Sequence, residues 1–153
     1  MPLTNFQKDV LEAIVANRSE LSHFAGGMVL NAPADSSRFS EDFDIFHDEV
    51  EDLVNSSERD VTALREAKFE VDLIDGDTSW KTPCTFRKAR VRKEGHSVEV
   101  DWAQDSAFRF FPIVHDEVLG WRLHLFDMAI NKALAITLTE LSAMAPPAST
   151  GCK

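Results

Sequence analysis

The stretch Phe24–His47, FAGGMVLNAPADSSRFSEDFDIFH, contains the features around which the chain is organised. Its last part, DFDIF, alternates acidic and apolar residues, a pattern that predicts a short strand. Because side chains alternate faces along a strand, Asp42 and Asp44 should lie on one face, with the apolar residues facing the core. Two neighbouring carboxylates repel each other unless a cation lies between them. The pair therefore predicts a site for a hard divalent ion, Mg²⁺ or Mn²⁺, which prefers oxygen ligands.

The residues before this strand allow two interpretations. Gly26 and Gly27 open a short helix or turn, where glycine lets the backbone approach a phosphate closely but also suits a tight turn without any ligand. Residues 31–40 are rich in turn formers and predict a loop. Near its end, Arg38 could contact a phosphate or form a salt bridge with Asp42 or Glu41.

The glycine pair followed by RFSEDFDIF resembles the signature of the DNA polymerase β-like nucleotidyltransferases. It is most similar to the AbiEii-type branch, the toxin component of abortive-infection and toxin–antitoxin pairs. The residues that match the motif in order are Gly26, Gly27, Arg38, Ser40, Asp42 and Asp44. The resemblance implies an enzyme that moves a nucleoside monophosphate from an NTP to an acceptor hydroxyl, with RNA such as tRNA, a protein or a small molecule as acceptor. It also implies a cognate antitoxin as a possible partner.

The resemblance also implies roles for particular residues. A third metal-binding carboxylate is expected on a neighbouring strand, where Asp101 is the best match and Glu99 the alternative on the same face. Asp42, Asp44 and Asp101 would be catalytic and would bind the metal. The implied nucleotide-binding residues are Gly26, Gly27, Arg38, Ser40 and Lys132. For Lys132, which lies in a mostly apolar helix, extension of the side chain into water is the simpler alternative.

Hydrophobic periodicity and turn residues give the remaining elements. We expect helices over 5–23, 48–68 and from 126 or 127 to about 141, and strands over 69–74, 82–92, 96–102, 108–112 and 117–123. Lys93-Glu94-Gly95 should join two of these strands as an antiparallel hairpin. The predicted fold class is α+β, a nucleotidyltransferase fold with a mixed, mainly antiparallel sheet and a C-terminal helical part that is short or missing. The N-terminal, middle and C-terminal helices should all cover the face of the sheet opposite Asp42, Asp44 and Asp101.

Composition narrows the class of protein. A chain of 153 residues that is 44% hydrophobic can bury the core of one domain. We expect this domain over residues 1–142 and a flexible tail at 143–153. Two cysteines and no visible apolar signal or membrane segment predict a cytoplasmic protein with no membrane partner. The net charge of −10 disfavours general binding of nucleic-acid backbone. Residues 81–93 nevertheless contain six lysines and arginines and no acid, and could meet a phosphate-bearing partner.

One position departs from the resembled family. Met28 follows the second glycine, where the family usually has a serine or threonine whose hydroxyl contacts a phosphate. This departure, with the short C-terminal part, favours an alternative: a degenerate, non-catalytic module of the same fold that binds a nucleotide or a protein. A calcium loop at residues 42–48 is excluded because Phe46 and His47 occupy its fifth and sixth positions.

Overall fold

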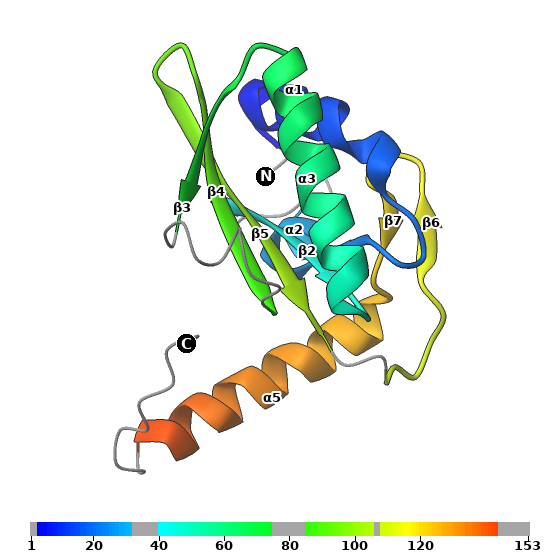
Figure 1. Cartoon of the computed structure of the whole chain (residues 1–153). Helices are drawn as coiled ribbons and strands as arrows, with labels where there is room; N and C mark the ends of the chain where they lie inside the picture. Colours follow the sequence, from blue (N-terminus) through cyan, green and yellow to red (C-terminus); the bar gives the residue numbers. More distant parts are fainter. Residues whose placement is uncertain (1–2, 32–39, 75–84, 106–107, 144–153) are drawn as a thin grey trace.

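The computed structural model describes residues 3–31, 40–74, 85–105 and 108–143 of the chain (Figure 1). The elements are α1 (Asn5–Ile14), the 3₁₀ turn η1 (Val15–Asn17), β1 (His23–Ala25), α2 (Gly26–Asn31), β2 (Asp42–His47), α3 (Val50–Glu66), β3 (Glu70–Ile74), β4 (Phe86–Lys93), β5 (His96–Gln104), β6 (Val114–Asp116), β7 (Gly120–Arg122) and α5 (Leu125–Ala143). The predicted loop that contains Arg38 and the predicted tail lie mostly outside the described residues.

The described strands form one mixed sheet in the order β3-β4-β5-β2-β1-β7-β6. Two neighbouring pairs, β2–β5 and β1–β7, are parallel, and the other four are antiparallel. The predicted α+β class with a mixed, mainly antiparallel sheet is therefore confirmed. Strand β2 lies in the middle of the sheet with β5 beside it, which brings two segments more than fifty residues apart in sequence into direct contact.

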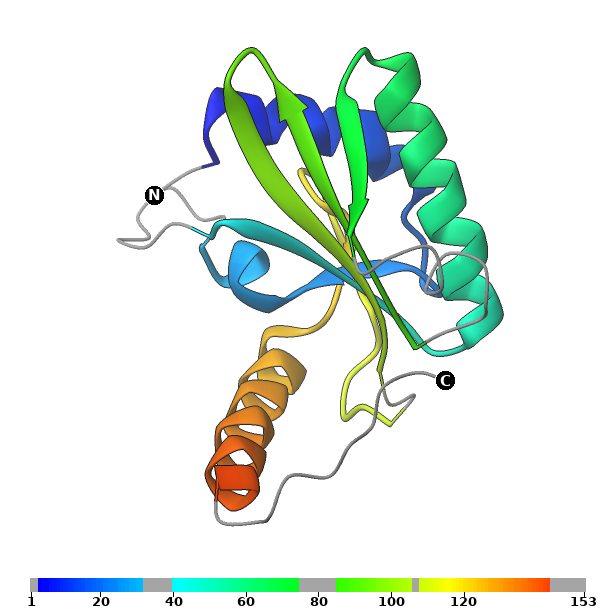
Figure 2. The ribbon, with the colours of Figure 1, turned by 60° about the vertical axis from the view of Figure 1, so that its left-hand side comes forward.

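Helices α1 and α3 pack together on one face of the sheet, as Figure 2 shows from the side. Alternate residues of β2 and β5 point into this core, and among them Phe43, Ile45 and Trp102 are fully buried. The indole Nε1 of Trp102 donates a hydrogen bond of 2.8 Å to Asp60 of α3. Asp60 also accepts from the guanidinium of Arg18 at 2.5 Å, and both side chains are completely buried. The polar contacts among Trp102, Asp60 and Arg18 thus stabilise the packing of the sheet on α3, in addition to the apolar contacts.

The first helix is shorter than the sequence predicts. It begins at Asn5, where Thr4 forms a capping box with Gln7, but it ends at Ile14 rather than near His23. After η1 the backbone of Arg18 becomes extended, because its side chain turns inward to pair with Asp60. The predicted apolar stripe therefore stops before Leu21, whose side chain is 54% exposed.

The predicted β4–β5 hairpin is confirmed. Lys93 pairs with His96, and the two residues between them, Glu94 and Gly95, have positive φ angles of 52° and 80°. Positive φ at both central residues matches the right-handed twist of the strands they join. This turn fixes the register of the whole hairpin, so that Lys88 lies opposite Asp101.

The segment between β5 and α5 differs from the prediction. Residues 108–112 form no strand, because the backbone N–H groups of Phe110 and Phe111 donate to the buried carboxylate of Asp127 at 2.7 and 3.0 Å. His115 and Asp116, between the two expected strands, belong to strand β6. Of the predicted strand at 117–123, only Gly120–Arg122 is a strand.

Helix α5 is present as predicted but is packed differently. It extends away from the sheet and from the other helices (Figures 1 and 2). Met128 and Asp127 are buried, whereas Leu134 and Ile136, predicted to pack inward, are each 55% exposed. The prediction that this helix covers the sheet is wrong. Among the described residues, no helix combines the length and the apolar content needed to cross a bilayer.

Candidate metal and nucleotide site

Strand β2 places the two aspartates of the central motif on the open face of the sheet. Burial alternates along the strand: Phe43 and Ile45 are fully buried, whereas Asp42 and Asp44 are partly exposed. This alternation follows from the period of two in an extended chain. The two carboxylates therefore point away from α1 and α3, as the sequence predicts.

Strand β5 supplies a third carboxylate from the same face. In the parallel register, Asp44 lies opposite Asp101 and Asp42 lies opposite Glu99. One carboxylate oxygen from each of Asp42, Asp44 and Asp101 lies within 4.8 Å of the other two. The structure thus brings together the three residues predicted to bind a metal ion.

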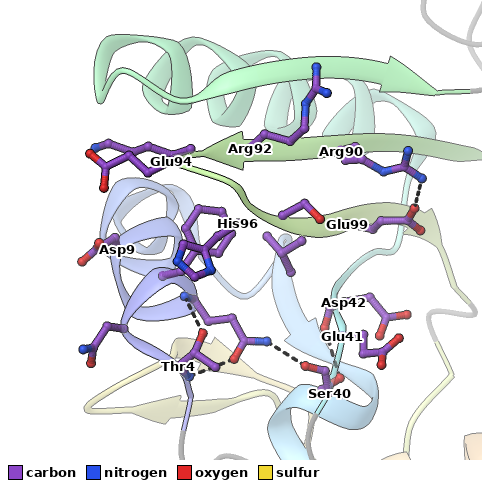
Figure 3. Close-up of a pocket in the computed structure, with 16 residues that line it drawn as sticks. Thr4, Asp9, Ser40, Glu41, Asp42, Arg90, Arg92, Glu94, His96 and Glu99 are labelled. Carbon is purple, nitrogen blue, oxygen red and sulfur yellow. Dashed lines mark hydrogen bonds and ion pairs between the residues drawn. The ribbon is translucent and has the colours of Figure 1, made fainter.

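Glu99, the alternative third carboxylate, has other partners. It accepts hydrogen bonds from Lys88 at 3.0 Å and from Arg90 at 2.7 Å, visible for Arg90 in Figure 3. These hydrogen bonds, that from Arg90 most of all, hold the pKa of Glu99 below its usual value. Since both of its oxygens are engaged by cations, Glu99 is less suited than Asp101 to bind a metal.

Lys88 also contacts the candidate site, at 3.3 Å from Oδ2 of Asp101. The other oxygen of that carboxylate, Oδ1, is buried and has no hydrogen-bond partner among the described residues. Burial raises the pKa of Asp101, and the neighbouring Lys88 partly opposes the rise. A buried oxygen without a partner is costly, so this atom is suited to bind a cation or accept a proton.

Asp44 is the most strongly perturbed of the three acids. Burial, and then the charges of Asp42 and Asp101, raise its pKa from 3.8 to about 6. The backbone N–H of Gly27 donates a hydrogen bond to its carboxylate and partly offsets this effect. Three acidic groups in mutual repulsion, with only oxygen donors facing one another, fit a hard divalent cation such as Mg²⁺ or Mn²⁺.

The glycine pair shapes this site in a way that the sequence does not reveal. Gly26 has a φ of +68°, and a Cβ atom there would lie 1.9 Å from Oδ2 of Asp44. A Cβ atom on Gly27 would lie 3.1 Å from the hydroxyl of Ser40. That hydroxyl donates to the carbonyl of Asp42 at 3.2 Å. The pair therefore makes room for the carboxylate, in addition to any contact with a phosphate.

Two of the predicted nucleotide-binding residues, Arg38 and Lys132, are not placed beside the three carboxylates by the described structure. Arg38 lies outside the described residues. Lys132 is exposed on α5, and within the described part of the chain no hydrogen bond or ion pair joins it to the carboxylates. Met28 is 1% exposed and packs in the core, so its side chain cannot replace the hydroxyl that the resembled family has there.

A wide hollow of about 1460 Å³ adjoins the acids, between the start of α1 and the β4–β5 hairpin (Figure 3). Asp42 and Glu99 line one end of it. Phe6 and His96 line the other end, with their rings stacked at a centroid distance of 5.6 Å. Arg90, Arg92 and Lys93, from the basic segment noted in the sequence, line it as well.

Lys88 is the site residue that sequence reasoning missed. A signal for it was present, because the predicted turn at residues 93–95 fixes the hairpin register and hence the pairing of Lys88 with Asp101. The contribution of Gly26 carries no comparable local signal, since it depends on how β1 and β2 pair.

Comparison with known proteins agrees with this architecture. No protein-family model matches the chain, and no curated protein matches it. The crystal structure of JHP933 from Helicobacter pylori is similar, with a TM-score of 0.60 and 18% identity over 85% of this chain and 57% of that one. A second structure from H. pylori, provisionally described as a nucleotidyltransferase, has a TM-score of 0.58 and 19% identity over 85% of this chain and 59% of that one.

The similarity defines the class of fold. The chain spans a little more than half the length of both H. pylori proteins. At such low identity the likeness shows the fold alone, and the fold is a mixed α+β arrangement of the nucleotidyltransferase type. The AbiEii branch within that class stays a prediction from the sequence motif.

Proposed function

We propose that this chain is a metal-dependent nucleotidyltransferase, which moves a nucleoside monophosphate from an NTP to an acceptor hydroxyl and releases pyrophosphate. The observation that carries the proposal is the cluster of Asp42, Asp44 and Asp101, whose carboxylate oxygens lie within 4.8 Å of one another on the open face of the sheet. The likeness of the fold to a protein provisionally described as a nucleotidyltransferase supports the same conclusion.

Asp42, Asp44 and Asp101 would hold Mg²⁺ or Mn²⁺. The bound cations would neutralise the charge that develops on the transferred phosphoryl group and on the leaving pyrophosphate. The raised pKa of Asp44, at about 6, means that this carboxylate is largely ionised near pH 7 and available as a ligand. The hydrogen bond from the Gly27 N–H and the close contact with Gly26 hold its orientation.

Asp101 is suited to a second task. Held by Lys88 at 3.3 Å, it would bind the metal on the acceptor side and would help to deprotonate the acceptor hydroxyl. Its pKa is raised by burial, which makes the carboxylate a stronger base. The NTP phosphates would lie near Gly26, Gly27 and Ser40, with Arg38 and Lys132 contributing positive charge.

The hollow beside the acids favours a large acceptor. Its volume of about 1460 Å³ exceeds the range of roughly 300–1,000 Å³ that is common for small-molecule sites. The stacked rings of Phe6 and His96 offer a surface for a nucleobase, and the half-exposed Arg90 and Arg92 would exchange their ion pairs with Glu99 and Asp72 for contacts with phosphate. We therefore favour the end of an RNA such as tRNA over a protein or a small molecule as the acceptor.

By its motif the protein would act as the toxin of an abortive-infection pair, with an antitoxin as its partner. The test is transfer of label from each α-labelled NTP to total RNA in the presence of Mg²⁺, measured for the wild type and for Asp44→Asn. Asp52→Asn is the matched control, since it makes the same chemical change on α3, which packs on the opposite face. Equal labelling by both variants, or none by the wild type with any acceptor, would reject the enzymatic proposal.

A second candidate function rests on Met28. Because its side chain is buried, the position lacks the hydroxyl that the resembled family directs at a phosphate. A non-catalytic module would bind NTP without turnover, and NTP at a hundredfold excess over Kd would then stabilise the protein by about 2.7 kcal/mol. Thermal stabilisation by NTP without release of pyrophosphate would favour this candidate over the enzyme.

A further inference from the structure

A cluster of exposed aromatic side chains lies where α5 leaves the body of the protein. Phe108 and Phe110 pack edge to face at 5.2 Å, and Phe110 and Phe111 pack in the same way against Phe126 at 5.9 and 5.4 Å. The four rings are 74%, 59%, 41% and 51% exposed in the order 108, 110, 111 and 126. Monomeric proteins seldom leave so many contiguous aromatic rings in water.

Helix α5 extends this apolar surface. At 100° per residue, the face that begins at Phe126 continues through Ile130, Ala133 and Thr137, with Leu134 and Ile136 on its two sides. Met128 and Asn131 lie on the opposite face, toward the body, where Met128 is buried and Asn131 donates to Asp105. The outward face and the aromatic cluster together form one surface, here called the α5 patch.

The size of the α5 patch can be compared with what an interface requires. At about 200 Å² for a whole phenylalanine side chain, the exposed parts of the four rings give roughly 450 Å². Leu125, Leu134 and Ile136, each about half exposed, raise the apolar area to roughly 600 Å². A standard interface buries about 800 Å² per partner, of which about 65% is apolar in homodimers. The patch therefore supplies the apolar area of one complete interface.

Charge indicates which partner fits. The chain carries a net charge of −10, so two copies repel each other wherever acidic surfaces meet. The charged residues in this region are Arg109, which pairs with Asp48, Asp127, which is buried and hydrogen-bonded, and Lys132, which lies outside the apolar face. The α5 patch is thus a surface on which a second copy of this acidic chain can approach without that repulsion.

We propose that two copies of this chain associate through the α5 patch, with the two α5 helices antiparallel about a two-fold axis. In this arrangement the aromatic cluster at the start of one helix covers Leu134 and Ile136 near the middle of the other, and the reverse contact forms by symmetry. Ala129 and Ala133, both exposed, lie along the apolar face and allow the helix axes to approach closely. The proposal does not depend on the proposed function.

Sedimentation velocity over a wide range of protein concentration tests the proposal. The full chain of 17.2 kDa should sediment as a species of twice that mass, and Ala133→Glu should weaken association by ~100-fold or more because it buries an unpaired charge. Thr62→Glu on α3 adds the same charge at an exposed helical position and should leave the dimer intact. A wild type that remains at 17.2 kDa, or an Ala133→Glu variant that still dimerises, overturns the proposal.

Cross-linking tests the symmetry of the pairing. In a chain with Cys84→Ser and Cys152→Ser, the further substitution Ile130→Cys should give a covalent dimer under mild oxidation, since Ile130 lies midway between Phe126 and Leu134 and residues near a two-fold axis meet their own copies. Thr62→Cys in the same background is the control and should give no covalent dimer. Equal cross-linking of both variants would show random collision and would reject the two-fold pairing.

Discussion

Replacing Asp44 by asparagine should stabilise the metal-free protein at neutral and alkaline pH. Burial and the charges of Asp42 and Asp101 raise the pKa of Asp44 from 3.8 to about 6. The unfolded chain therefore ionises this group at a lower pH than the folded chain does. With a pKa difference of about 2 and 1.36 kcal/mol per pKa unit, ionised Asp44 destabilises the fold by about 3 kcal/mol above pH 6.

The sign of this effect fixes the pH window. Well below pH 3.8, Asp44 is protonated in both the folded and the unfolded state, and it does not destabilise the fold. As the pH rises from there to about 6, the folded state holds the proton more tightly, so the contribution of this group lowers the free energy of unfolding. The asparagine side chain of the Asp44→Asn variant cannot ionise, and its oxygen can still accept the N–H of Gly27. The free energy of unfolding of the variant should thus exceed that of the wild type by about 3 kcal/mol at pH 8 and by about 1 kcal/mol near pH 4.5.

Urea unfolding in the presence of a chelator measures this difference. The control is Asp52→Asn, in the first turn of α3 on the other face, which should lower the free energy of unfolding by no more than the ~1 kcal/mol of a helix-dipole interaction at both pH values. If Asp44→Asn destabilises the protein at pH 8, or if its effect is the same at both pH values, the repulsion inferred among the three carboxylates is wrong.

Three further predictions concern the same site and its support. Gly26→Ala should destabilise the fold by about 1–3 kcal/mol in urea, because its Cβ would meet a carboxylate at 1.9 Å, whereas Gly95→Ala, which shares a positive φ but has open space, should cost about 1 kcal/mol or less. Asp60→Ala should cost about 3–5 kcal/mol in the same assay, since it leaves the buried charge of Arg18 without its partner; a loss below 1 kcal/mol would contradict this. Mg²⁺ at a hundredfold excess over Kd should stabilise the wild type by about 2.7 kcal/mol in thermal unfolding and should have much less effect on Asp101→Asn; equal stabilisation of both would exclude this residue as a ligand.

The sequence predicts those parts of the fold that depend on neighbouring residues. Strand β2 follows from the alternation of acidic and apolar residues, and the β4–β5 hairpin follows from Glu94-Gly95, which adopts the positive φ angles that such turns need. Alternation likewise fixes the common face of Asp42 and Asp44, whereas the position of Asp101 beside them depends on the pairing of β2 with β5, which only the family resemblance implied.

Predictions fail where a distant partner decides the local structure. The first helix ends at Ile14 because Arg18 pairs with Asp60 on α3, a contact that helical periodicity cannot reveal. The expected strand near Phe110 is replaced by hydrogen bonds to Asp127. Helix α5 has the apolar content of a core helix, yet periodicity does not say whether the covering surface belongs to the same chain.

The hydrogen bond from Trp102 to Asp60 links the helix layer to strand β5, which carries Asp101 on its other face. Trp102 follows Asp101 on β5, and the two side chains point to opposite faces, one into the helix layer and one toward the other acids. A change in the helix layer that shifts Trp102 must therefore move the adjoining carboxylate by way of a single peptide unit. Substitutions in the helix layer that move Trp102 should therefore also change the geometry of the proposed metal site.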